Sequence, residues 1–290
     1  IRTLQENQCI LTLEHWRELL RSTLGSFGAI FLVLEAFEVL TDGNVKMPFA
    51  LFVLIGLMPG LAFFFLDGYR ISGFLRREVE IPNPGNDTKI TVKFGDLFSE
   101  RGWKAIGVND FFDSIVDEYL VSSKSLHGLV LNTYWRENKS DWDKQIASSL
   151  RVQQGNRESR SKGNRLRYPI GTTARACTED QKFLFVALSK TNAKHNVTSA
   201  NAEMLIKAVR GMVAEARAAC SMEPLVIPLM GSGLARVGIK NSVLVDLIIT
   251  AVLEESRNGR VTGEIKIVLP EDKSHHINLK NHIRNWAYGK

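Results

Sequence analysis

The run from Met47 to Leu66 contains twenty consecutive residues and no charged side chain. An apolar helix of about 20 residues matches the thickness of the hydrocarbon core of a bilayer, so this run predicts a transmembrane helix. A second apolar run, from Leu24 to Leu40, comes before it, and only a short turn separates the two. We therefore expect a transmembrane helical hairpin at residues 23–70, preceded by an amphipathic segment at residues 1–22.

Basic residues indicate how this hairpin is oriented. The basic residues that flank the two apolar runs on their outer sides are Arg17, Arg21, Arg70, Arg76 and Arg77. The turn between the runs carries Lys46 and Asp42. Because basic residues beside membrane spans stay on the cytoplasmic side, we predict two spans with both termini in the cytoplasm and the turn outside.

Two acidic residues, Glu35 and Glu38, interrupt the first apolar run. They lie three residues apart, so they share one face of a helix. Ionisable side chains inside a span are costly and usually face a partner or water. Two interpretations stay open: the carboxylates reach water at the outer interface, or they line a pore or an oligomer contact.

The 290-residue chain has a net charge of +6 and a pI of about 9.2, which favours an anionic partner such as a nucleotide, a nucleic acid or a membrane surface. Its three cysteines, Cys9, Cys177 and Cys220, are far apart. Their number and spacing provide neither a disulfide framework nor a zinc motif, and they fit a reducing compartment. No carboxylate or cysteine spacing supports the pair His275-His276 as ligands, so we predict a surface turn there and no metal site.

After Arg77 the sequence alternates between strand-like and helix-like segments. The segments predicted as strands are Glu78–Ile81, Lys89–Phe94, Trp103–Asn109, Phe183–Ser189, Leu225–Leu229 and Glu264–Leu269. The segments predicted as helices are one that ends at Leu150, then Ser199–Cys220, Asn241–Glu255 and Asn278–Tyr288. This alternation favours an α/β domain at residues 77–290 with layered helices and a largely parallel sheet.

Polar or small residues follow strand-like runs at Asp96, Asn109, Thr172 and Gly231. Because ligands of parallel sheets bind at the carboxyl ends of the strands, we expect these residues to meet at one crevice. Gly231 is also the first of three glycines in a loop between a strand and a helix. The backbone N–H groups of such a loop can hold phosphate, and an ordinary strand-to-helix turn is the alternative.

The segment from Arg151 to Arg167 carries six basic residues and one acidic residue, Glu158. Two glycines break it, so we expect a mobile, solvated loop or the tip of a hairpin. A surface for nucleic acid would interleave aromatic residues with the basic ones for base stacking, and only Tyr168 is close. We therefore predict no nucleic-acid partner.

Three motifs, in this order, resemble a macro domain: Gly95-Asp96-Leu97, Ala105-Ile-Gly-Val-Asn109 and Ile227-Pro-Leu-Met-Gly-Ser-Gly-Leu234. The resemblance covers the chain from about Arg77 to its C-terminus. Together with the hairpin, the whole chain resembles the membrane-anchored macro effectors of Thoeris anti-phage systems. The resemblance implies a three-layer α/β/α fold with a mixed, mostly parallel sheet, preceded by two transmembrane helices.

The resemblance also implies a ligand, ADP-ribose or a derivative of it, and a role for each motif. Asp96 would accept a hydrogen bond from the adenine amino group, with the backbone N–H of Leu97 beside it, and Asn109 would lie by the distal ribose. The residues that would hold the diphosphate by their backbone N–H groups are Gly231, Ser232, Gly233 and Leu234.

Two loops depart from the pattern of the family. Ser122 to Gly128 stands where a macro domain has a glycine-rich loop, and the candidate ligand-binding residues in it are Ser123, Lys124, Ser125, Leu126 and His127. Ala235 and Arg236 stand where an aromatic residue usually follows the second phosphate loop. The added space and the added cation favour recognition of an ADP-ribose that is modified at its distal ribose, rather than hydrolysis.

The function implied by the resemblance is the sensing of a signal at the bacterial inner membrane. A TIR-domain partner enzyme would make an ADP-ribose-derived signal, such as a histidine–ADP-ribose conjugate. Binding would rearrange a homo-oligomer and disrupt the lipid bilayer. We therefore expect no catalytic residues, no cofactor and no enzymatic activity, and the alternative is a membrane-tethered ADP-ribosyl hydrolase.

Overall fold

The computed structural model describes residues 13–40, 48–71, 75, 77–83, 87–233, 237–274 and 277–286. Several predicted features lie outside these residues: residues 1–12 of the amphipathic segment, the turn between the two spans, the ligand-binding candidates Leu234, Ala235 and Arg236, and the pair His275-His276. The chain divides into two compact units, residues 1–79 with 278–281 and residues 80–277 with 282–290.

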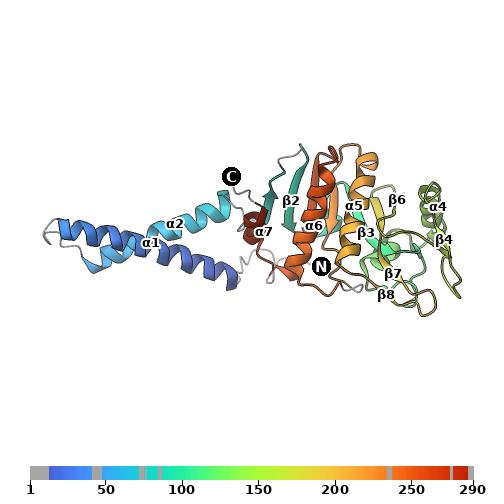
Figure 1. Cartoon of the computed structure of the whole chain (residues 1–290), viewed down its shortest axis with the longest axis horizontal. Helices are drawn as coiled ribbons and strands as arrows, with labels where there is room; N and C mark the ends of the chain where they lie inside the picture. The colour runs from blue at the N-terminus through green and yellow to red at the C-terminus, as the bar shows by residue number, and fades with distance from the viewer. Residues whose placement is uncertain are drawn as a thin grey trace. The chain divides into compact units, whose positions relative to one another are not determined.

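The first unit contains the two helices expected from the apolar runs, α1 (Leu13–Leu40) and α2 (Phe49–Leu66), as Figure 1 shows. A π-helical turn, η1 (Asp67–Ile71), follows α2. The stretches Trp16–Leu40, of 25 residues, and Phe49–Arg70, of 22 residues, are long and apolar enough to cross a membrane. The hairpin therefore has the lengths that two membrane spans require.

Small residues bring the two helices close together. Gly56 and Gly60 are buried in α2, and a Cβ atom at residue 60 would lie 2.4 Å from both the backbone oxygen of Ser22 and Ser26 Oγ. Ser26 Oγ also donates a hydrogen bond of 2.8 Å to the backbone oxygen of Gly56. The four-residue spacing of the two glycines thus serves the contact between α1 and α2.

The outer surface of the hairpin is apolar. Leu32, Val33 and Phe63 are more than half exposed, as expected of side chains that face lipid. Glu35 and Glu38 are also exposed, both on α1. Their role, at the interface with water, in the lining of a pore or in an oligomer contact, stays a prediction.

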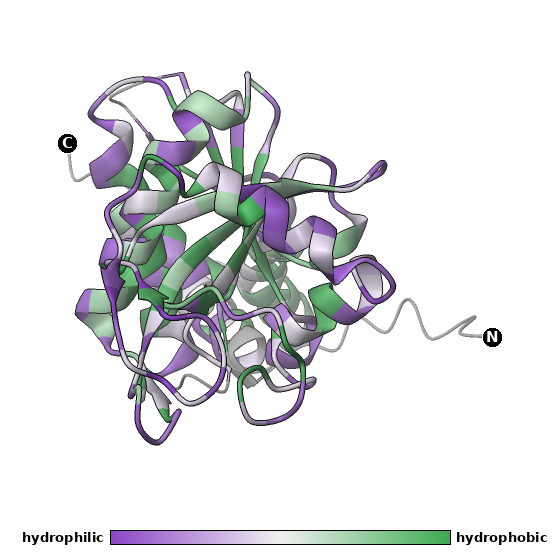
Figure 2. Ribbon diagram, turned by 90° about the vertical axis from the view of Figure 1, so that its right-hand side faces the viewer, coloured by the Kyte–Doolittle hydropathy of each residue, from purple (hydrophilic) through white to green (hydrophobic). Residues whose placement is uncertain are grey.

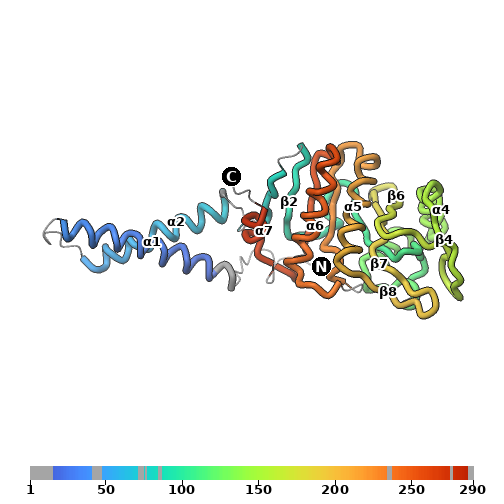
Figure 3. Tube along the Cα trace, in the orientation of Figure 1, coloured from blue at the N-terminus to red at the C-terminus, as the bar shows by residue number. Residues whose placement is uncertain are grey.

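The rest of the chain alternates strands and helices, and the trace in Figure 3 follows this alternation to the C-terminal helix α7 (Leu279–Trp286). The strands are β1 (Glu78–Ile81), β2 (Lys89–Phe94), β3 (Trp103–Asn109), β4 (Asn156–Arg157), β5 (Leu166–Arg167), β6 (Thr173–Cys177), β7 (Lys182–Thr191), β8 (Thr198–Ser199), β9 (Leu225–Pro228) and β10 (Glu264–Leu269). The other helices are α3 (Leu126–Tyr134), α4 (Lys139–Ser149), α5 (Ala202–Ala219) and α6 (Asn241–Ser256), with 3₁₀ turns η3 (Leu97–Ser99) and η4 (Glu271–Lys273).

The main sheet has the strand order β1-β2-β10-β9-β3-β7-β6, with β8 beside β7. Neighbouring strands from β2 to β7 in this order are parallel, whereas β6 and β8 pair with β7 in the antiparallel sense. The sheet is therefore mixed and mostly parallel, as the sequence predicts. β4 and β5 form a separate small hairpin.

Helices cover both faces of this sheet, which gives the three layers. On one face, Phe183 and Phe185 of β7 pack against Trp135, which directly follows α3, and Phe185 also packs against Trp142 of α4. On the other face lie α5 and α6, which contact each other, while α5 also contacts β6 and β7. Figure 2 shows the strands of the interior as mostly hydrophobic, as expected for a sheet covered on both sides.

The strands predicted at Glu78–Ile81, Lys89–Phe94, Trp103–Asn109 and Glu264–Leu269 have these same bounds in the structure. The sequence patterns missed β6 because its residues are small or polar and show no apolar run. Thr172 consequently lies just before a strand, so the expectation that it follows one is wrong.

Candidate functional site

A cavity of about 690 Å³ lies at the carboxyl ends of β2, β10, β9, β3 and β7. The ladder between β3 and β9 joins Trp103 to Leu225 and Lys104 to Val226, after which the two strands separate. A crevice between diverging strands of this kind is where open α/β sheets bind ligands. The strand order also fixes the order of side chains along the cavity, from Asp96 after β2 to Ser189 in β7.

Asp96 marks the first end of this cavity. It follows β2 and is exposed, and its carboxylate accepts a hydrogen bond of 3.1 Å from the backbone N–H of Phe98. That bond caps the 3₁₀ turn η3, in which Leu97 is buried. Burial, together with the nearby Asp96 carboxylate, raises the pKa of the Tyr134 hydroxyl, which therefore stays neutral. The carboxylate has room to accept one further hydrogen bond from a ligand.

The loop from Ser122 to Gly128 lines the middle of the cavity and is held by side-chain hydrogen bonds. Glu118 Oε1 accepts from the backbone N–H of Ser123, at 2.8 Å. Hydrogen bonds from the side chain and the backbone of Ser123, and from the side chain of Ser122, lower the pKa of Glu118. Ser125 caps α3 by accepting from the backbone N–H of Gly128, at 2.9 Å. The first N–H groups of α3, at Leu126 and His127, face the end of the helix, where anions bind.

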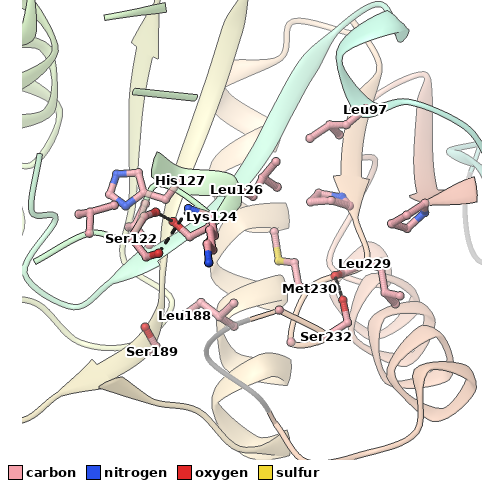
Figure 4. A pocket seen from close by; sticks show the side chains of 18 of the residues that line it. Leu97, Ser122, Lys124, Leu126, His127, Leu188, Ser189, Leu229, Met230 and Ser232 are labelled. Atoms are coloured by element: carbon pink, nitrogen blue, oxygen red, sulfur yellow. Dashed lines mark hydrogen bonds between the residues drawn. The ribbon is translucent and has the colours of Figure 1, made fainter. Parts of the chain in front are cut away.

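Lys124 and His127 point in different directions from this loop. Figure 4 shows the side chain of Lys124 between the loop and Leu188, whereas the ring of His127 lies on the side away from Ser232. His127 is buried, with its ring 5.8 Å from that of Trp142, and burial lowers its pKa to about 3. The imidazole is therefore a neutral part of the core, and Lys124 supplies the positive charge.

The second loop, from Leu229 towards α6, lies across the cavity from the first. Gly231 has a φ of +83°, which favours glycine, and its backbone oxygen accepts from the N–H of Val237 at 3.1 Å. Ser232 Oγ donates a hydrogen bond of 3.0 Å to the backbone oxygen of Leu229. The Ser232 hydroxyl is thereby tied to its own loop, which leaves backbone N–H groups as the means of holding phosphate. The contributions expected of Ala235 and Arg236 stay predictions.

Asn109 lies at the far end of the cavity, where β3 ends. Its Oδ1 accepts from the backbone N–H groups of Phe111, at 3.3 Å, and Asp113, at 3.1 Å. Its Nδ2 donates to Asp113 Oδ2 at 2.8 Å. The amide is therefore fixed in one orientation, with a single N–H of Nδ2 left for other partners.

The basic segment holds this far end together, so the expectation of a solvated loop is wrong for two of its arginines. The side chain of Arg160 is buried, and its Nη1 lies 3.0 Å from Asp113 Oδ2. Arg167 Nε lies 3.0 Å from a carboxylate oxygen of Asp110. Burial raises the pKa of Asp110, and the hydrogen bonds from Thr191 and the charge of Arg167 oppose this. The hairpin alternative is correct, since β4 and β5 pair here.

The structure brings most of the predicted ligand-binding residues together. The predicted residues that line the cavity are Asp96, Leu97, Asn109, Lys124, Ser125, Leu126, His127, Gly231, Ser232 and Gly233. Ser123 belongs to the same loop, and Thr172 is not among the residues that line the cavity. Sequence reasoning missed Leu120, Val121, Leu188, Ser189 and Thr198, which also line it. Ser189 could have been found, because it ends a predicted strand. Leu120 lies in a loop and Thr198 in the two-residue strand β8, and neither segment has a sequence pattern that would indicate a site.

Comparison with known proteins gives a consistent result. Residues 90–270 match the family described as "Thoeris protein ThsA, Macro domain". The curated Thoeris protein ThsA of Bacillus amyloliquefaciens is 25% identical over 156 residues, which are 52% of this chain and 51% of that protein. The chain thus aligns with about half the length of this relative.

Solved structures of a macrodomain from Oceanobacillus iheyensis also align with this chain. The alignment with one of its mutants covers 72% of this chain and 97% of the macrodomain chain, with 10% sequence identity and a TM-score of 0.49. The same macrodomain with ADP covers 72% of this chain and 96% of its own, with 10% identity and a TM-score of 0.48.

Proposed function

The chain belongs to the family of Thoeris protein ThsA macro domains, and from this premise we propose that it is a membrane-anchored effector of Thoeris anti-phage immunity. In this proposal the macro domain binds an ADP-ribose-derived signal, such as a histidine–ADP-ribose conjugate, on the cytoplasmic side of the bacterial inner membrane. A TIR-domain partner enzyme makes the signal. The domain acts as a sensor and not as an enzyme.

The order of chemical groups along the cavity carries the proposal. Asp96 offers a carboxylate to the adenine amino group at the end of β2. The two loops that start at Ser122 and Leu229 offer backbone N–H groups and Lys124 in the middle, which suits a diphosphate. Asn109 and Ser189 offer polar groups at the other end, which suits a ribose.

The length of the cavity supports the same ligand. From β2 to β7 there are four strand-to-strand steps of about 4.8 Å, or roughly 19 Å in all. This length accommodates two ribose-bearing groups joined by a diphosphate. A mononucleotide would occupy the adenine end and the nearer phosphate loop alone, so it would bind more weakly.

Ligand binding acts on the membrane by shifting a conformational equilibrium. The signal stabilises one arrangement of a homo-oligomer, in which the hairpins formed by α1 and α2 disrupt the bilayer. The two helices long and apolar enough to cross a membrane support the anchoring step. Loss of the membrane barrier would stop the growth of an infected cell.

Calorimetry on the full chain in lipid nanodiscs tests the binding step. We expect ADP-ribose and its histidine conjugate to bind, and AMP to bind at least about 10-fold more weakly, because it forgoes more than one hydrogen bond. The absence of heat and of a melting shift with both ADP-ribose ligands would contradict the proposal. Release of ADP-ribose from a modified protein substrate would instead favour the membrane-tethered hydrolase.

Dye release from liposomes tests the membrane step. Vesicles that contain the full chain should leak after addition of the signal and stay intact without it. Glu35→Gln and Glu38→Gln variants distinguish the interpretations of these carboxylates. Leakage that survives both changes places the carboxylates at the interface with water, whereas loss of leakage indicates a pore or an oligomer contact.

A further inference from the structure

The basic segment at residues 151–167 has no role in the function proposed above, yet one of its arginines is among the most buried charges of the protein. The side chain of Arg160 is 1% exposed, as is that of Asp113, with which it forms an ion pair. Arg160 Nη1 lies 3.1 Å and 3.0 Å from the two carboxylate oxygens of Asp113 and 2.9 Å from the backbone oxygen of Asn164. Its guanidinium also stacks 4.0 Å from the centre of the Phe111 ring.

Asp113 joins this arginine directly to the cavity. Its Oδ2 accepts the hydrogen bond from Asn109 Nδ2, at 2.8 Å, and the same oxygen lies 3.0 Å from Arg160 Nη1. Because both side chains are buried, each needs the other as its partner, and the two short contacts hold the Asp113 carboxylate in one place. Arg160 is therefore the group that positions Asp113 to accept from Asn109.

The same segment also holds two loops that line this end of the cavity. Arg160 Nη2 donates to Asn196 Oδ1 at 2.5 Å, and Asn196 precedes Thr198, which lines the cavity. Lys162 Nζ donates at 2.5 Å to Asp117, whose other oxygen accepts from the backbone N–H of Leu120 at 2.7 Å. The basic segment therefore fixes the two segments that carry Thr198 and Leu120 at this end of the cavity.

We propose that Arg160 is a positioning residue for the distal end of the ligand, and that it acts through Asp113 and Asn109. The inference rests on the proposed function, because it assigns the distal ribose to this end of the cavity. With Oδ1 of Asn109 occupied by two backbone N–H groups and one N–H of Nδ2 given to Asp113, the group left for the ligand is a single N–H donor. Its partner is an acceptor oxygen, such as a ribose hydroxyl oxygen.

The test compares two ligands that differ only at this end, ADP-ribose and ADP, on the full chain in lipid nanodiscs. In the Arg160→Met variant the affinity for ADP-ribose should fall at least about 10-fold, the value of one good hydrogen bond, because Asn109 loses its fixed orientation. The affinity for ADP should stay within about threefold, since the adenine and diphosphate groups lie elsewhere. A merely structural role would lower both affinities together.

Two further variants keep this test decisive. Arg165→Met makes the same chemical change on the same hairpin at an exposed side chain, and it should leave both affinities unchanged. If Arg160→Met does not fold, the double variant Asp113→Leu with Arg160→Met removes both buried charges and the acceptor for Asn109 Nδ2, and it should still show the selective loss for ADP-ribose.

The possible outcomes separate the inference from the proposed function. If the unaltered chain binds neither ligand, the proposed function fails. If the unaltered chain binds ADP-ribose no more tightly than ADP, or if the altered chain loses both affinities equally or neither, the role of Arg160 is overturned while ADP-ribose binding stands.

Discussion

The two ends of the cavity are held in place by different kinds of interaction. At the end proposed to bind adenine, Asp96 is exposed, and in the described part of the chain its carboxylate accepts one hydrogen bond, from a backbone N–H two residues away. At the distal end, Asn109, Asp113 and Arg160 are buried, and the arginine comes from a segment 47 residues beyond its partner. A change at the first end therefore costs the fold at most one exposed capping hydrogen bond, whereas the groups at the second end are part of the buried core.

The largest effect is expected from breaking the distal end. Asp113→Ala leaves Arg160 buried without a counter-ion, which should cost about 3–5 kcal/mol of the free energy of unfolding. For a domain of this size the melting temperature should fall by roughly 6–20 °C. Thermal unfolding of the full chain in detergent, followed by tryptophan fluorescence, measures this shift.

A surface ion pair provides the matched control for this prediction. Glu203 pairs with Lys207 one turn along α5, with both side chains well exposed. Glu203→Ala should leave the melting temperature unchanged, because water and salt screen such a pair. A loss of stability of the same size in both variants would contradict the conclusion that burial makes the Asp113–Arg160 ion pair more important for stability than a surface pair.

The same contrast explains how much of the site the sequence could predict. Asp96 and Gly231 stand directly after strands whose apolar runs are plain in the sequence, so strand-end reasoning found them. The pairing of Asp113 with Arg160 depends on which segments the fold brings together, and a charge run by itself is typical of solvated loops. The wrong expectation for Thr172 has a similar cause, because β6 is an edge strand of small and polar residues.

At the adenine end we expect a change in ligand preference without a change in stability. In the proposed binding mode the Asp96 carboxylate accepts from the adenine amino group, so the unaltered chain should bind ADP-ribose roughly 10- to 150-fold more tightly than its hypoxanthine analogue, which carries an oxygen there. In Asp96→Asn the amide can also donate, and the preference should collapse. Calorimetry with both ligands measures it.

Asp87 serves as the control for this prediction. It is exposed in the turn before β2, and Asp87→Asn makes the same change of charge away from the cavity. The preference for adenine should survive it. Retention of the preference in Asp96→Asn would show that adenine is recognised by other groups.

Acid sensitivity should arise at His127, on the α3 side of the cavity. Because burial lowers the pKa of His127 from 6.5 to about 3, its contribution to stability is complete above pH 6.5 and is lost as the pH falls towards 3. At pH 5 the loss should be about 2 kcal/mol, from about 1.4 kcal/mol per pH unit. Melting curves at pH 7 and pH 5 measure it.

Two histidine variants separate this effect from the general titration of carboxylates. His127→Leu should melt at nearly the same temperature at both pH values once the change shared by all variants is subtracted. His195→Leu, at an exposed side chain, should keep the acid sensitivity of the unaltered chain. If His127→Leu kept the acid sensitivity and His195→Leu lost it, the His127 ring would be solvated rather than buried.

The smallest effect on stability is expected in the second loop, from Leu229 towards α6. Two of its glycines differ in how well they would tolerate an added Cβ atom. Gly231 has a positive φ, and an added Cβ would lie 2.7 Å from Val237 Cγ2, so Gly231→Ala should cost about 1–2 kcal/mol. No described atom lies within 4 Å of a Cβ added at Gly233, so Gly233→Ala should leave the melting temperature unchanged. Both glycines line the cavity in the loop proposed to hold the diphosphate, so affinity for ADP-ribose should fall in both variants. Unchanged affinity in Gly233→Ala would move the diphosphate away from this residue and towards the loop that precedes α3.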